Sequence, residues 1–308
     1  MRKITLGACI IICTLVCLAC AAGGENPGDE ELGDPLSGKA ISTVAELKLF
    51  IEKGTTETAI LAASIDLGNE MLRIPAERGS LTIEGNGFAL VGRGDSVIRL
   101  DEGVTITIND LTVKGSACGI GMMGDNQLSG RDLRIEGGMH AVSGLGSVQI
   151  GSESKLSIEG GSGFGLSVRE LTVSEGAVIS ASGGSGAIHI SGSAVVQERA
   201  EIDAVSGAYN AFKCGKVLSM LDGSRLSVAN TSDYHGAEIT ELSIEGTVSI
   251  YAHGGTKGVG LFLMELYDEL TVIGECDPPA RSESGHGMIK FIKNAPESTP
   301  ASQGSGEE

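Results

Sequence analysis

Acidic and amide side chains recur at one position of a repeated four-residue pattern. The pattern alternates apolar and polar residues, and its fourth position is Glu84, Asn109, Glu136 and Glu159 in four successive repeats. If these repeats stack as neighbouring strands, the carboxyl groups of Glu136 and Glu159 lie about 5 Å apart, near the separation of a retaining glycosidase pair. With Arg134 beside them, they are candidates for acid/base chemistry. The four residues together are also a candidate calcium site, because calcium prefers oxygen ligands, and a solvated strand face without chemistry is the third interpretation.

The second position of the same pattern carries mostly hydroxyl side chains. Besides Arg134, this column consists of Thr82, Thr107, Ser157, Ser180, Asp203, Ser227, Ser249 and Thr271. Stacked at the spacing of neighbouring strands, these residues form a candidate binding face for a glycan or a partner strand. Small hydroxyl residues also suit the solvent side of a strand, so a face without a ligand is the alternative interpretation.

Both columns depend on a repeat that returns nine times. The repeats begin at Leu81, Ile106, Leu133, Leu156, Ile179, Ile202, Leu226, Val248 and Leu270. Their first and third residues are apolar, so one side of each strand faces a core. A single repeat is too short to bury that side, and stacked coils cover it. The sequence therefore predicts an all-β solenoid of about nine coils of 22–27 residues, with an extra loop at 117–131 in the longest interval.

An amphipathic helix is predicted before the first repeat. Thr43 and Glu46 have the spacing of a capping box, and Gly54 is a typical helix terminator. The apolar side of this helix would consist of Val44, Leu47, Phe50 and Ile51. We expect the helix to cap the open apolar end of the first coil.

From residue 40 to about residue 293, the chain resembles the right-handed parallel β-helix proteins of the pectate-lyase-like superfamily. The segments that carry this resemblance are ISTVAEL (41–47), ILAASIDL (60–67) and IEGNG (83–87), followed by the repeats. The resemblance implies three short parallel strands in each coil. It implies no particular activity, because one fold serves many functions.

Composition and charge exclude some classes of partner. The chain has 22 Lys and Arg against 40 Asp and Glu, for a formal net charge of −18. Nucleic acid is therefore not an expected partner, because phosphate binding needs clustered cations. With no Trp, six Phe and four Tyr, an aromatic sugar-binding platform is not expected either. The five histidines lie at dissimilar repeat offsets and predict no zinc site; they are His140, His189, His235, His253 and His286.

The N-terminal residues predict export. Residues 1–19 contain Arg2 and Lys3 followed by an apolar run, the pattern of a secretory signal peptide. The sequence CLAC (17–20) resembles a bacterial lipoprotein signal, which implies that Cys20 is lipidated and anchors the protein at the cell envelope, in the outer membrane or at the cell surface. Residues 20–40 predict a flexible tether, 41–295 the β-helix domain and 296–308 a disordered tail. Four of the seven cysteines lie within residues 1–20. The three that follow, Cys118, Cys214 and Cys276, form no paired motif and predict buried thiols.

These features favour a non-catalytic cell-envelope lipoprotein that presents a rigid β-helical face. A glycan, or a protein of the envelope or of a host, is the expected partner. No cofactor is required by this interpretation, and calcium is the one ion that the acidic column suggests. The alternative is a polysaccharide lyase or glycoside hydrolase that uses the acidic residues near Glu136 and Glu159.

Overall fold

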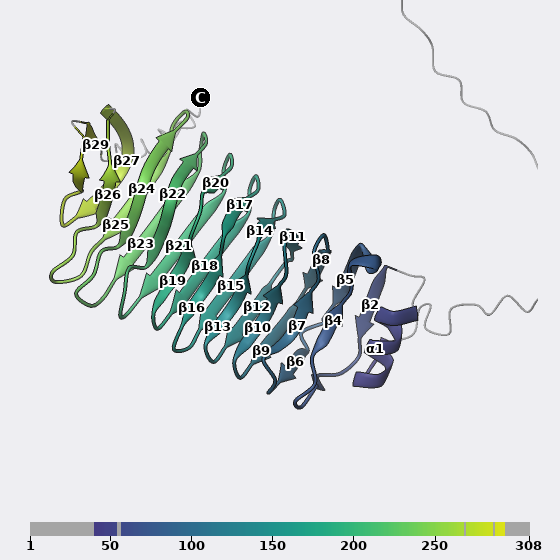
Figure 1. Cartoon of the computed structure of the whole chain (residues 1–308). Helices are drawn as coiled ribbons and strands as arrows, with labels where there is room; N and C mark the ends of the chain where they lie inside the picture. The colour runs from purple at the N-terminus through teal and green to yellow at the C-terminus, as the bar shows by residue number, and fades with distance from the viewer. Residues whose placement is uncertain (1–39, 54–56, 268, 286, 293–308) are drawn as a thin grey trace, which may run out of the picture. The chain divides into compact units, whose positions relative to one another are not determined.

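Short parallel strands that wind in successive coils make up almost all of the described chain (Figure 1). The computed structural model describes residues 40–53, 57–267, 269–285 and 287–292, which belong to one compact unit. The predicted all-β parallel β-helix is confirmed. Eleven strands stack on one face, so the described chain forms about eleven coils rather than nine.

The coils from β3 to β20 contribute one strand to each of three faces, and the later coils depart from this pattern. Face one is the 11-stranded sheet, which consists of β3 (Ile65–Asp66), β6 (Ala89–Gly92), β9 (Leu111–Gly115), β12 (Leu133–Gly137), β15 (Lys155–Gly160), β18 (Val178–Gly183), β21 (Glu201–Ser206), β23 (Arg225–Asn230), β25 (Ser249–His253), β27 (Glu269–Asp277) and β29 (Met288–Ile292).

Faces two and three follow face one along each coil. Face two consists of β4 (Leu72–Ile74), β7 (Ser96–Leu100), β10 (Cys118–Met122), β13 (His140–Gly144), β16 (Phe164–Val168), β19 (Gly186–Ile190), β26 (Leu261–Glu265) and β28 (Arg281–Ser284). Face three consists of β1 (Ala40–Ile41), β2 (Thr58–Leu61), β5 (Ser80–Glu84), β8 (Thr105–Asn109), β11 (Asn126–Ser129), β14 (Ser147–Ile150), β17 (Glu170–Val173) and β20 (Ala194–Val196). The longer β22 (Phe212–Met220) and β24 (Ala237–Ile244) span both faces and join them into one sheet.

The repeats that mark the sequence lie on more than one face. Those at Leu81 and Ile106 are on face three, in β5 and β8, whereas those from Leu133 onward are on face one. The longest interval between repeats, from Ile106 on face three to Leu133 on face one, therefore spans a full coil and one additional face. The extra loop predicted at 117–131 is wrong, because that segment forms the regular strands β10 and β11.

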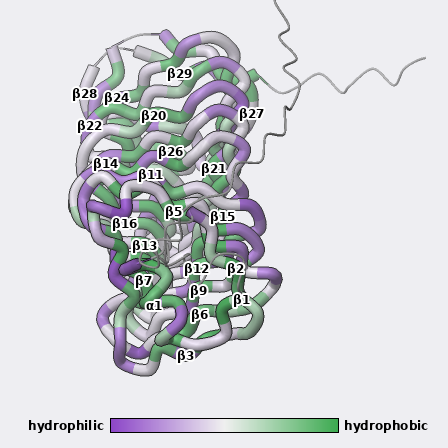
Figure 2. The backbone as a smooth tube through the Cα atoms, turned by 90° about the vertical axis from the view of Figure 1, so that its right-hand side faces the viewer, coloured by the Kyte–Doolittle hydropathy of each residue, from purple (hydrophilic) through white to green (hydrophobic). Residues whose placement is uncertain are grey.

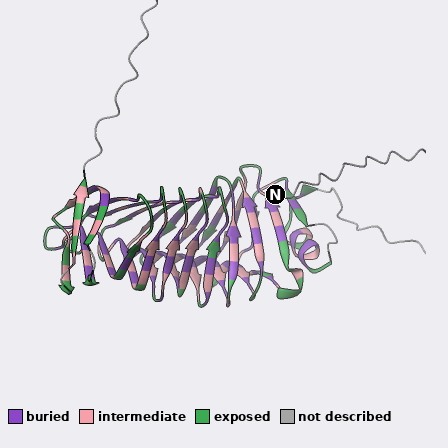
Figure 3. Ribbon diagram, turned by 90° about the horizontal axis from the view of Figure 1, so that it is seen from above, coloured by how far each residue is buried: buried purple, intermediate pink, exposed green. Residues whose placement is uncertain are grey.

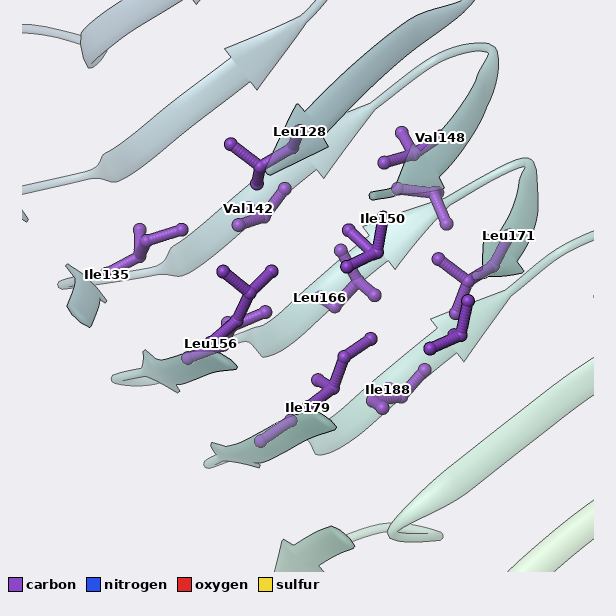
Figure 4. Packing of buried hydrophobic residues seen from close by; sticks show 14 of the residues in the cluster. Leu128, Ile135, Val142, Val148, Ile150, Leu156, Leu166, Leu171, Ile179 and Ile188 are labelled. Carbon is purple, nitrogen blue, oxygen red and sulfur yellow. The ribbon is translucent and has the colours of Figure 1, made fainter. Parts of the chain in front are cut away.

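Aliphatic side chains stack on like side chains through the interior. On face one, Leu133 pairs with Leu156, and Leu156 with Ile179. Figure 4 shows Leu156 and Ile179 of this row together with buried residues of the other two faces, such as Leu166 and Leu171. Figure 2 shows hydrophobic and hydrophilic residues mixed along the strands, and Figure 3 shows buried positions next to more exposed ones. Strict alternation is found on faces one and three, as in β8 and β15, whereas face-two strands such as β10 and β19 carry consecutive buried residues. The interior is therefore a continuous aliphatic column rather than a cavity for a ligand.

The predicted N-terminal helix is confirmed as α1 (Val44–Lys53). Its capping box forms: the Thr43 N–H donates to Glu46 Oε2, and the Glu46 N–H donates to Thr43 Oγ1, each at 3.2 Å. Leu47, Phe50 and Ile51 are buried in the common core, so the helix covers the first coil (Figure 1). Among the described residues, no helix is long and apolar enough to cross a membrane.

Candidate functional site

The predicted acidic column is divided between two faces. Glu84 and Asn109 are partners at the ends of β5 and β8 on face three, where Asn109 Nδ2 donates to Glu84 Oε1 at 2.8 Å. Glu136 and Glu159 are partners on β12 and β15, on face one. The four-residue column that suggested calcium is therefore wrong in its geometry, because its repeats came from two different faces. The described residues contain no group of three or more His, Cys, Asp or Glu placed to hold a metal ion.

Two basic side chains form ion pairs with the carboxylates of Glu136 and Glu159. Lys114 Nζ lies 2.8 Å from Glu136 Oε2, and Arg134 Nε lies 2.8 Å from Glu136 Oε1. The other end of the Arg134 guanidinium lies 3.1 Å from Glu159 Oε2. The hydrogen bond from Lys114, together with the charge of Arg134, holds the pKa of Glu136 below its usual value. Glu136 thus stays ionised, whereas a general acid needs a raised pKa.

The residues of the predicted hydroxyl column are strand partners over only part of its length. Its continuous section runs along face one through Arg134, Ser157, Ser180, Asp203 and Ser227. Thr82 and Thr107 are partners on face three instead. Ser249 pairs with Arg225, and Thr271 with Lys290, so both lie outside the column, which Tyr251 continues. A shallow hollow of about 560 Å³ borders Arg134, Ser157 and Ser180, but neither Glu136 nor Glu159 lines it.

A second hollow lies where the corners between face one and face two become longer. These corners have two or three residues after β12, β15 and β18, but five after β21, six after β23 and seven after β25. Phe164 and Ser185 line this hollow. So do Tyr209 and Tyr234, which lie on the five-residue and six-residue corners. The longer corners therefore place aromatic side chains on the edge between faces one and two, where the earlier corners are short.

The residue types at the ends of the face-one strands change together with corner length from β12 to β23. Gly115, Gly137 and Gly160 are partners there, and a Cβ atom on Gly137 would lie 1.8 Å from the carbonyl oxygen of His140. Later in the same row come Ser206 and Asn230, whose buried side chains need polar partners.

The backbone of the longer corners supplies those partners. Asn230 Nδ2 donates to the carbonyl oxygen of Tyr209, and Asn230 Oδ1 accepts from the Ser232 N–H at 2.8 Å. Ser232 Oγ in turn donates to the carbonyl oxygen of Ala208 at 3.0 Å. Asn230 therefore ties the corner that carries Tyr209 to the corner that carries Tyr234.

We call this hollow the tyrosine pocket. It has a volume of about 630 Å³ and is lined by Phe164, Ser185, His189, Tyr209, Asn210, Lys213, Tyr234, His235 and Glu238. The volume falls within the range of sites that hold small ligands. Tyr209 and Tyr234 are 53% and 43% exposed, and their ring centroids lie 4.9 Å apart with the rings tilted by 43°. The two rings therefore offer exposed apolar surface beside polar groups.

One side of the pocket is a row of outward-facing residues on successive coils. His189 pairs with Lys213, and Lys213 with Glu238. Lys213 Nζ lies 2.7 Å from Glu238 Oε1, and Asn210 Nδ2 donates to Glu238 Oε2 at 2.5 Å. The Glu238 side chain is only 17% exposed and that of Lys213 is 41% exposed. Both oxygens of the carboxylate thus have a donor, and the charges of Lys213 and Glu238 balance.

Both histidines of the pocket are held in the neutral form. Burial is the main cause that lowers the pKa of His189 and of His235. Lys213 lowers the pKa of His189 further. At His235, the charge of Glu238 partly opposes the lowering of the pKa and Arg281 adds to it. The Val259 N–H donates to His235 Nδ1 at 3.0 Å, which leaves Nε2 as the protonated nitrogen of the neutral ring. Aromatic stacking fixes the rings: His189 lies 4.9 Å from Phe164, and His235 lies 4.8 Å from Phe262, measured between ring centroids.

Composition argued against an aromatic platform, and that expectation does not hold for this corner. Phe164, Tyr209, Tyr234 and Phe262 are four of only ten Phe and Tyr residues, yet they lie in or beside one pocket. A signal was present in the sequence, because Tyr209 and Tyr234 are separated by 25 residues, about one coil. Counting residue types over the whole chain does not detect such clustering.

The fold and the tyrosine pocket define a parallel β-helix protein with an aromatic, charge-balanced pocket at its lengthened corners. In comparisons with protein-family models, curated proteins and solved structures, no match to this chain was found.

Proposed function

We propose that this protein is a non-catalytic, lipid-anchored protein of the bacterial cell envelope that binds a glycan in the tyrosine pocket. The observation that supports this proposal is the pair of exposed tyrosine rings beside Lys213, Glu238 and Asn210. Aromatic rings provide apolar contact area, and adjacent donors and acceptors suit hydroxyl groups. Sugars present both kinds of surface on one molecule.

The location at the envelope is part of the same proposal. It is supported by the signal-like residues 1–19 and by Cys20, which lie outside the described residues, as do the tether up to residue 39 and the tail from 296 onward. The resemblance to the pectate-lyase-like superfamily is compatible with a carbohydrate ligand. Labelling cells with a radioactive fatty acid tests the anchor, because the Cys20→Ala variant should lose the label and remain unprocessed.

Binding is favoured over catalysis by the state of the carboxylates. Glu136 and Glu159 are paired with Lys114 and Arg134, and Glu238 is the single carboxylate among the residues that line the tyrosine pocket. Most glycoside hydrolases need two carboxylates with different protonation states. A lyase or hydrolase is therefore the less favoured function.

A binding experiment with tyrosine variants tests the proposal. The full-length protein, purified in mild detergent, is applied to a glycan array and its ligands are measured by calorimetry. Tyr209→Ala and Tyr234→Ala should each weaken binding about tenfold or more, because each removes stacking surface. Tyr251→Ala is the matched control, since Tyr251 lies on β25 of face one and outside the pocket.

A parallel assay tests the enzymatic alternative. The same protein is incubated with uronate polysaccharides, with and without calcium, while unsaturated products are followed by ultraviolet absorbance, and reducing ends are followed for hydrolysis. We expect no product. Product formation that disappears in the Glu136→Gln/Glu159→Gln double variant would replace the binding proposal with an enzyme.

A further inference from the structure

We infer that the tyrosine pocket selects an uncharged sugar over a uronate or an amino sugar, an inference that rests on the proposed function. It begins from the two ionic side chains that line the pocket. Lys213 and Glu238 lie 2.7 Å apart, and the second oxygen of Glu238 accepts from Asn210. Each charge therefore already has a partner, and a charged group on a ligand would compete with that partner.

An anionic sugar would meet unfavourable surroundings in this pocket. Its carboxylate would lie close to Glu238, and its natural partner, Lys213, is already paired. His189 and His235 offer no compensating charge as neutral rings, and His235 accepts a backbone hydrogen bond at Nδ1. The whole chain carries a net charge of −18, which adds long-range repulsion. Like charges placed together at a binding site oppose affinity strongly.

A cationic sugar meets the converse difficulty. Glu238 is the one carboxylate that lines the pocket, and both of its oxygens already accept hydrogen bonds from Asn210 and Lys213. An ammonium group would compete with Lys213 for the same carboxylate and would repel it. An uncharged sugar can bind without competing for either member of the Lys213–Glu238 ion pair.

The remaining groups of the pocket suit hydroxyl groups and sugar ring faces. Tyr209 and Tyr234 present two rings tilted by 43°, so they offer two apolar surfaces at an angle rather than one flat platform. The Nε2–H of His235 is a donor, and the Ser185 hydroxyl, which donates to the Ser162 carbonyl oxygen at 2.8 Å, retains acceptor capacity. Hydrogen bonds from these groups would distinguish the positions of sugar hydroxyl groups without an ionic contact.

Two single substitutions test this inference by altering the charge balance in opposite directions. Glu238→Gln leaves Lys213 unpaired, and Lys213→Met leaves Glu238 unpaired. Each protein is measured against sets of oligosaccharides of the same linkage and length that differ only in carrying neutral, uronate or amino sugars. Circular dichroism confirms folding, and either variant alone provides a test if the other does not fold. Tyr251→Ala serves again as the control that should retain wild-type preference.

We expect the wild-type protein to bind its best neutral ligand at least about tenfold more tightly than the uronate or amino-sugar counterpart. Glu238→Gln should reduce the disadvantage of the uronate about tenfold, and Lys213→Met should do the same for the amino sugar. A wild-type preference for a charged sugar that depends on Tyr209 would overturn this inference and leave glycan binding intact. Absence of binding to every sugar class would instead overturn the proposed function, and this inference with it.

Discussion

At the scale of single residues, the chemistry of the tyrosine pocket depends on imidazoles that stay neutral and on charges that are already paired. His189 and His235 are neutral because burial lowers the pKa of each below the ordinary value of 6.5. Glu136, by contrast, is held ionised by Lys114 on an exposed face. Burial and pairing, rather than residue type, therefore decide which side chains can accept a proton.

The lowered pKa values predict a dependence of stability on pH. In the unfolded chain these imidazoles bind protons near pH 6.5, whereas in the folded chain they do so only at lower pH. Between these limits the unfolded chain binds more protons, so the free energy of unfolding falls as the pH drops below about 6.5 and stops falling once the folded-state pKa values are passed. Urea denaturation at about pH 7.5 and about pH 5.5 measures this loss.

The matched variant is His189→Asn/His235→Asn, which removes both titrating groups. It should lose less free energy of unfolding than the wild type over the same pH interval. Carboxylates whose pKa is lowered in the folded chain titrate there below their ordinary values, which already lie below this interval. An equal loss in both proteins would show that these histidines are not the groups responsible.

At the scale of elements, the residue that ends a face-one strand shapes the corner that follows it in several coils. Gly137 permits a two-residue corner because the His140 carbonyl oxygen would be 1.8 Å from any Cβ at that position. Asn230 occupies the same row and stabilises a six-residue corner through its side chain. In these two coils the residue in this row suits the length of its corner, although Gly254, next in the row, is the first residue of the seven-residue corner before β26.

This difference predicts that two glycine-to-alanine substitutions will change the free energy of unfolding by very different amounts. Gly137→Ala should lower the free energy of unfolding by about 2 kcal/mol or more, because the backbone at the corner must move. Gly207→Ala should change it by less than about 0.5 kcal/mol, since the nearest atom to its Cβ, Thr231 Oγ1, is 3.7 Å away. Urea denaturation of both variants measures the difference, and equal losses would contradict this account of the corners.

The sequence was sufficient to predict the strands, the aliphatic core and α1, because apolar alternation and the Thr43–Glu46 capping box are local patterns. It was not sufficient to assign a repeat to a face. Faces one and three alternate in the same way, so Leu81 on face three and Leu133 on face one looked like members of one row. The calcium column and the extra loop both followed from that ambiguity.

The tyrosine pocket was harder to predict for a different physical reason. Corner length is not fixed by the period of the strands, and the pocket exists only because the later corners are longer. The row that contains His189, Lys213 and Glu238 does keep the coil spacing, at intervals of 24 and 25 residues. Comparing outward positions at that spacing would have found part of the site.

At the scale of the whole β-helix, like charges gather along one edge. The corners between face three and face one carry an acidic side chain in five successive coils, namely Glu153, Glu175, Glu198, Asp222 and Glu245. Arg199 is the one cation in these five described corners. It pairs with Glu175, and its pKa is raised by Glu175 first and also by Glu153 and Glu198. Stacked coils therefore bring net negative charge together along this edge.

Screening of this edge predicts stabilisation by salt. The thermal midpoint should rise between about 0.02 M and about 0.5 M NaCl, because exposed like charges repel less at high ionic strength. Arg199→Gln should be less stable than the wild type at low salt and should gain more from added salt. Thermal melts followed by circular dichroism measure both effects. A midpoint that falls with salt in both proteins would mean that attractive pairs dominate the surface.

The variable corners between face one and face two have a consequence for protein engineering and for divergence. Their length changes from two to seven residues while the flanking strands keep their parallel partners. Lengthening a surface loop costs little closure entropy, so such corners can accept insertions without altering the scaffold. Randomised libraries at 207–211 and 231–236 would produce new ligand specificities on an unchanged coil, and related chains could acquire different ligands by the same route.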